Sequence, residues 1–163
     1  QDRIKDFSWR VTEELGEALD AITNKDHYQE ELIDGLHFLT ELTILVGKDY
    51  NTILPNDTPP FREDHLEDLV EGAKYLLQEK LHSLEVLVSR FIEQLAMMCN
   101  CLKNKPWKQS MMKTDREAFY HRLSNVWCYY ICILVFSGFD AWWIAEIYLK
   151  KSQVNQFRQR SNY

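Results

Sequence analysis

The scarcity of glycine and proline constrains the fold of this chain more than any other feature. Five glycines and four prolines occur in 163 residues, and three of the prolines lie between positions 55 and 60. These two residues most often end helices or form the turns between strands. The long stretches without them predict long helices and an all-α fold.

Apolar residues recur at helical spacing, every three or four positions, along most of the chain. Gly47 is expected to end one of these segments in a left-handed conformation. Thr114 or Asp115 is expected to cap the start of another. Four core helices are predicted in this way, over about 3–23, 27–47, 116–136 and 140–157.

The middle of the chain has a weaker pattern. Residues 63–102 predict two helices, or one long bent helix that is weakened at Gly72. We expect a single all-α domain spanning 1–163, in which a helical bundle with a four-helix core, formed by about 3–47 and 116–157, carries a helical insertion at about 50–110.

Composition argues against several classes of protein. A formal net charge of −6 disfavours binding to nucleic acid, because most of the surface would repel phosphates. The apolar run at 126–136 is too short to span a membrane, and the charged residues at 2–6 do not resemble a secretory leader. The four cysteines lack zinc-site spacing. We expect a cytoplasmic protein with reduced thiols that binds neither nucleic acid nor membrane.

Two pairs of acidic residues lie on the first two predicted helices. Glu14 and Glu17 are three residues apart, as are Glu31 and Asp34, so each pair projects from one face of its helix. An antiparallel hairpin would bring the four carboxylates together, and a hard cation such as Mg²⁺ prefers oxygen ligands. The alternative is an ordinary solvated acidic surface. Phe38 shares a face with Glu31 and Asp34 and could stack on a planar ring.

The C-terminal segment is basic although the chain is acidic. No acidic residue follows Glu146, whereas four cationic side chains do: Lys150, Lys151, Arg158 and Arg160. Such a segment could bind nucleic acid, a membrane or a phosphate, or simply aid solubility.

These motifs resemble the all-α NTP pyrophosphatase superfamily, which includes the MazG-like enzymes and the dimeric dUTPases. The resemblance rests on three motifs: ExxE at Glu14 and Glu17, ExxD at Glu31 and Asp34, and DGLHF at 34–38. The ending KSQVNQFRQRSNY is similar to the K-x-x-x-N-x-x-R-Q-x-x-G-Y ending of dimeric dUTPases and of phage dCTPase/dUTPases, with Asn162 in place of the glycine. The resemblance covers the first two helices and about the last forty residues.

The resemblance implies a cofactor and a set of site residues. Mg²⁺, with Mn²⁺ as the alternative, would be held by Glu14, Glu17, Glu31 and Asp34, and Glu14 or Glu17 would act as catalytic base. Lys151, Asn155 and Arg158, on one face of the last helix, would clamp a triphosphate. The substrate-binding residues would be Phe38, Lys151, Asn155, Arg158 and Tyr163.

The implied activity is hydrolysis of dUTP to dUMP and diphosphate. The segment before Glu14 has no match for the glutamine and asparagine that recognise uracil in dUTPases, so a dCTPase or a broader dNTP pyrophosphatase remains an alternative. A catalytically inactive helical interaction module is a further one. Because sites in this superfamily are commonly completed between subunits, the resemblance implies a homodimer or higher oligomer, and the aromatic residues of the last two helices could supply the apolar interface.

Overall fold

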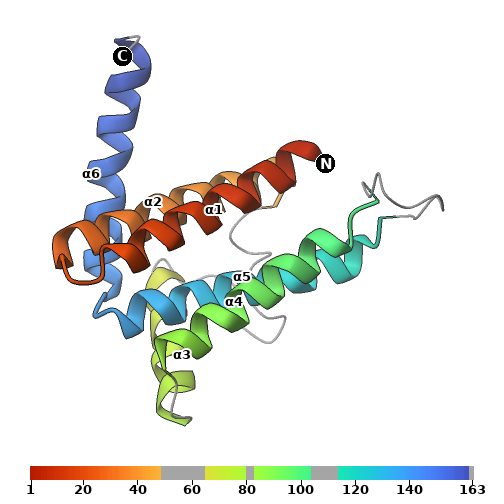
Figure 1. Cartoon of the computed structure of the whole chain (residues 1–163), viewed down its shortest axis with the longest axis horizontal. Coiled ribbons are helices and arrows are strands. Elements are labelled where there is room, and N and C mark those ends of the chain that lie inside the picture. The colour runs from red at the N-terminus through yellow and green to blue at the C-terminus, as the bar shows by residue number, and fades with distance from the viewer. Residues whose placement is uncertain (49–64, 80–82, 104–113, 162–163) are drawn as a thin grey trace.

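The computed structural model describes residues 1–48, 65–79, 83–103 and 114–161, and these form an all-α fold, as predicted (Figure 1). The described helices are α1 (Asp2–Asp20), α2 (Lys25–Leu45), α3 (His65–Glu79), α4 (Leu84–Asn100), α5 (Arg116–Phe136) and α6 (Ala141–Arg160).

Helices α1 and α2 form an antiparallel hairpin and lie side by side (Figure 1). The side chain of Asn24 caps α2 by accepting a hydrogen bond from the backbone N–H of His27. Val11 and Leu15 of α1 are buried, as are Leu32 and other apolar residues of α2. This packing sets the register in which the acidic residues of the two helices face each other.

The middle helices belong to the same hydrophobic core as the others. Phe91 of α4 is fully buried and packs against Tyr130 of α5, and α3 packs mainly on α5. The predicted weakening at Gly72 is wrong, because α3 continues through this residue. Buried Val70 and Ala73 hold that part of α3 in place, which offsets the roughly 1 kcal/mol helix cost of a glycine. A new helix begins only after Ser83, whose side chain caps α4.

Two of the predicted helix boundaries are confirmed by the residues that cap or end the helices. Gly47 follows α2 with a φ of 71°, and Asp115 caps α5 by accepting from the N–H of Ala118. Gly138, with a φ of 90°, turns the chain between α5 and α6, where Asp140 caps the new helix. Both turns use the left-handed backbone conformation that glycine adopts at no steric cost.

A close contact sets the distance between α2 and α5. The hydroxyl of Tyr130 donates a hydrogen bond of 2.8 Å to the carbonyl of Leu32, and both residues are fully buried. A Cβ at position 35 would overlap with this hydroxyl, so only glycine fits there. Gly35 is next to Asp34 in the sequence. This contact therefore also fixes how far the acidic face of α2 lies from the core.

Helix α6 crosses α2, and its second half projects away from the other helices (Figure 1). Buried Phe139 and Ile144 anchor its start, whereas Val154 and Phe157 near its end are exposed. Of the aromatic residues in the last two helices, which were expected to offer an apolar interface, Trp127 and Tyr130 are buried within the chain and Trp142 is exposed.

Among the described residues, no helix taken singly reaches the length and apolarity that a bilayer crossing needs. Helix α5 together with 141–158 of α6 reaches them, across a bend of 102°.

Candidate functional site

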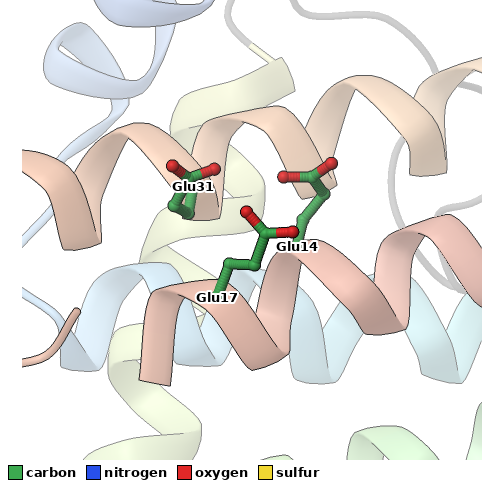
Figure 2. Close-up of side chains that lie close together, drawn as sticks. All are labelled: Glu14, Glu17 and Glu31. Atoms are coloured by element: carbon green, nitrogen blue, oxygen red, sulfur yellow. The ribbon is translucent and has the colours of Figure 1, made fainter. Parts of the chain in front are cut away.

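Three carboxylates converge between α1 and α2. The side chains of Glu14 and Glu17 from α1 and of Glu31 from α2 each place a carboxylate oxygen within 4.8 Å of the others (Figure 2). The three-residue spacing on α1 puts two acids on one face, and the antiparallel hairpin brings the third opposite them. Three of the four predicted ligands therefore lie together, and we refer to them as the carboxylate cluster.

The carboxylate cluster is electrostatically strained. Burial, a hydrogen bond with Glu31, and the negative charges of Asp34, Glu17 and Glu31 raise the pKa of Glu14 from 4.5 to about 7. The side chain of Glu31 is 12% exposed, and the Nδ1 atom of His27 lies 3.1 Å from its carboxylate. Such a cluster gains free energy from a cation, because a positive charge removes the repulsion that favours the protonated form.

Asp34, the fourth predicted ligand, has a different partner. Its Oδ2 atom lies 2.7 Å from the Nζ atom of Lys151 on α6, and the two side chains are 24% and 25% exposed. The structure thus joins a residue expected to bind metal to a residue expected to bind phosphate. The negative charge of Asp34 still acts on Glu14, so the ion pair adjoins the carboxylate cluster.

A cavity of about 580 Å³ lies beside these groups, between α1, α2 and α6. This volume is within the range of about 300–1,000 Å³ typical of small-molecule sites. Three acids, three aromatic rings, two amides and a hydroxyl line the cavity, contributed by Glu14, Asp34, Glu41, Phe7, His37, Phe38, Asn155, Gln156 and Ser152. Four of the predicted site residues, on helices far apart in sequence, therefore line one cavity: Glu14, Asp34, Phe38 and Asn155.

Phe38 forms part of the cavity wall and is held by its neighbours. Its ring is tilted against that of Phe7, with centroids 6.2 Å apart, and the guanidinium of Arg10 lies 5.5 Å from its centroid. A ring held in this way, with one side against protein and another facing a cavity, can stack on a planar ligand.

None of the basic residues described on α6 is among the residues that line the cavity. Lys151 contacts Asp34, and Asn155 lies in the lining one turn further along the helix. Arg158 is exposed and is not among the lining residues. Tyr163 lies outside the described residues. The role of each as a ligand residue stays a prediction.

His37, which follows Leu36 in the DGLHF motif, packs against α6. Its ring stacks on that of Tyr148 of α6, with centroids 3.8 Å apart, and burial lowers its pKa. Its Nε2 atom is buried and has no hydrogen-bond partner within the described part of the chain.

Five lining residues were not identified as site residues from the sequence: Phe7, His37, Glu41, Ser152 and Gln156. Glu41 lies three residues after Phe38 and seven after Asp34, so its helical spacing was the available signal.

The donor set fits a hard divalent cation. All side chains of the carboxylate cluster and Asp34 offer oxygen atoms, which Mg²⁺ and Mn²⁺ prefer, and the described cysteines lie elsewhere.

A protein-family model described as dUTPase matches residues 18–163. The match takes in Glu31, Asp34 and α6, and it begins one residue after Glu17. Neither a curated protein nor a solved structure matches the chain.

Proposed function

Because this chain belongs to the dUTPase family, we propose that it hydrolyses dUTP to dUMP and diphosphate in a reaction that depends on Mg²⁺, with Mn²⁺ as the alternative cation. We further propose that it is a member of the all-α NTP pyrophosphatase superfamily, which includes the MazG-like enzymes and the dimeric dUTPases, and that it is of the phage dCTPase/dUTPase type.

The observation that carries this proposal is the arrangement around the cavity. Glu14 of the carboxylate cluster and Asp34 line the cavity on one side, α6 contributes Asn155, and Lys151 adjoins the cavity through its ion pair with Asp34. A nucleoside triphosphate with its divalent cation matches this arrangement, because the cation suits the carboxylates and the phosphates suit the ammonium.

The metal would be held by Glu14, Glu17 and Glu31, with Asp34 as the fourth ligand. When bound, it would neutralise charge on the phosphate oxygens and lower the pKa of a coordinated water. A glutamate of α1 accepts the proton of the attacking water. Glu14 lines the cavity, which supports it as that base, and the exposed Glu17 is the second candidate.

The remaining residues bind and orient the substrate. Lys151 and Arg158 neutralise the phosphates, and Asn155 binds a sugar hydroxyl or a phosphate oxygen. Phe38 stacks on the base, a contact worth about 1–3 kcal/mol for single bases in general. Tyr163 completes the set.

We also propose that the protein acts as a homodimer or higher oligomer. Val154 and Phe157 are 46% and 71% exposed, and they flank two cavity-lining residues, Asn155 and Gln156. A second copy packed on this end of α6 would cover the apolar side chains and close the cavity on its open side.

The decisive experiment is a nucleotide panel. The purified chain is incubated with dUTP and each of the four standard dNTPs, with Mg²⁺ or with EDTA, and the monophosphate and diphosphate products are quantified. We expect dUMP to form fastest and EDTA to abolish the reaction. Faster release of dCMP would instead favour the cytosine-specific alternative. Lack of turnover with every nucleotide, in Mg²⁺ and in Mn²⁺, would contradict the proposal and favour an inactive interaction module.

A matched pair of variants connects the activity to the carboxylate cluster. Glu31→Gln should lower kcat at least about 100-fold, as is usual for loss of a group that acts in the transition state. Glu30→Gln removes the same charge from an exposed position one residue away and should leave activity near wild type. Equal activity in the two variants would place the reaction elsewhere.

A further inference from the structure

The ion pair between Asp34 and Lys151 joins two groups that catalysis would have to separate. We propose that Lys151 is an exchangeable counter-ion, which neutralises Asp34 in the unliganded protein and moves to a substrate phosphate when a divalent cation binds. Cation and nucleotide binding would then depend on each other. This inference rests on the proposed function, because it takes Asp34 as a metal ligand and Lys151 as a phosphate ligand.

The geometry suits a contact that is stable yet reversible. The Nζ and Oδ2 atoms are 2.7 Å apart, and about three quarters of each side chain is buried, so solvent and salt screen the pair less than an exposed one. A lysine ammonium is a compact charge on a flexible stem, so it can replace a metal ion next to a carboxylate and also swing away from it.

Lys151 and a divalent cation compete for Asp34. Two positive charges on the same carboxylate repel each other strongly at these distances. The negative charges of Glu14, Glu17 and Glu31 lie close by and attract the cation, which carries twice the charge of the ammonium. The cation should therefore displace Lys151, but it binds more weakly than it would to a free Asp34.

The displaced ammonium has a new partner when a nucleotide is present. Lys151 lies one turn before Asn155, which lines the cavity that would hold the phosphates. A metal that binds alone breaks the ion pair without replacement, whereas a metal that binds with a nucleotide exchanges one ion pair for another. By reciprocity, each ligand then raises the affinity for the other by the same factor.

The neighbouring lysine provides a matched control. Lys150 carries the same charge on the same helix, but it is 68% exposed and pairs with Glu146 at 2.6 Å. Removing its charge should affect a distant cation only through weak, screened electrostatics.

The first test measures Mn²⁺ binding to the full chain without nucleotide, by electron paramagnetic resonance or calorimetry. We expect Lys151→Gln to bind Mn²⁺ about three- to tenfold more tightly than wild type, from the loss of a partly buried ion pair. Lys150→Gln should stay within about twofold. A non-hydrolysable dUTP analogue should tighten Mn²⁺ binding much more in wild type than in Lys151→Gln. Equal or weaker Mn²⁺ binding by a folded Lys151→Gln variant would overturn the proposal.

A second test uses the wild-type protein and so does not depend on how the variant folds. Acetylation of lysine amines, quantified by mass spectrometry, reports the accessibility of Lys151 with Lys150 as internal reference. Mg²⁺ alone should increase labelling of Lys151, and Mg²⁺ with the analogue should decrease it again. Labelling that does not respond to Mg²⁺ would overturn the exchange.

Turnover of dUTP by the same preparation separates this inference from the proposed function. If the enzyme hydrolyses dUTP but the labelling of Lys151 does not respond to Mg²⁺, the proposed function stands and the proposed exchange is wrong. A protein that neither binds Mn²⁺ nor hydrolyses any nucleotide overturns both.

Discussion

The imidazole ring of His37 on α2 stacks on the phenol ring of Tyr148 on α6, with the centroids 3.8 Å apart and the planes inclined by 19°. His37 lies three residues after Asp34, and Tyr148 lies three residues before Lys151. The ring stack and the ion pair are therefore successive contacts along the crossing of the two helices. Together they hold α6 against α2 beside the cavity.

This stack should contribute measurably to stability. A double-mutant cycle with His37→Ala and Tyr148→Ala, followed by urea unfolding, should give a coupling energy of about 0.5–1.5 kcal/mol, as is typical of aromatic pairs. Tyr148→Phe keeps the ring and should retain most of the coupling. Strict additivity of the two alanine substitutions would show that the rings do not interact in solution.

The contact between Gly35 and Tyr130 predicts opposite effects at two glycines. Gly35→Ala should lower the free energy of unfolding by about 1–3 kcal/mol, because its Cβ overlaps with the buried Tyr130 hydroxyl. The added Cβ of Gly16→Ala on α1 meets no atom of the described residues within 4 Å, so this substitution should stabilise the protein by about 0.5–1 kcal/mol through helix propensity.

Removing the hydroxyl provides a specific control for the same contact. In a Tyr130→Phe background, Gly35→Ala should cost less than in wild type, although the ring carbon at 3.2 Å still crowds the new Cβ. An equal cost in both backgrounds would show that the overlap is not the cause.

The raised pKa of Glu14 predicts how stability depends on pH without metal. The folded pKa is about 7 and the reference value is 4.5, so between these values the folded state holds a proton that the unfolded state has released. The free energy of unfolding contributed by Glu14 should thus fall as the pH rises across this range.

Calorimetry in EDTA at several pH values, on wild type and Glu14→Gln, tests this dependence. The Tm of wild type should fall relative to that of the variant as the pH rises from about 5 to about 8. The comparison also cancels the contribution of His37, whose lowered pKa acts in the opposite direction. Parallel curves for the two proteins would contradict the prediction.

If the exposed end of α6 forms the proposed oligomer interface, a polar substitution there should disrupt the oligomer. Phe157 is 71% exposed, and Phe157→Ser should shift the protein towards monomer in sedimentation experiments and lower kcat/KM. Tyr75→Ser on α3 alters an aromatic residue that is 62% exposed and should change neither property. A wild-type protein that sediments as a monomer at assay concentrations would contradict the proposed assembly.

Much of the helical architecture was predictable because its signals are local. Sparse glycine and proline, apolar periodicity and capping side chains act within one or two turns, so they led to the all-α fold, to Gly47 as a helix end and to Asp115 as a cap. Gly72 was misinterpreted because its helix is stabilised by packing on α5, a long-range contact with no local signature.

For the candidate site, the sequence by itself determined which side chains share a helix face. Helix geometry alone places Glu14 on the same face as Glu17, and Glu31 on the same face as Asp34. Only the tertiary structure decided how those faces meet. The crossing of α6 over α2 pairs Asp34 with Lys151, leaves Arg158 outside the cavity lining and brings Glu41 and Gln156 into it. The spacing of residues along a helix determines the direction in which each side chain projects from the helix axis. The position of that axis depends on packing between residues far apart in the sequence, such as Tyr130 against Gly35.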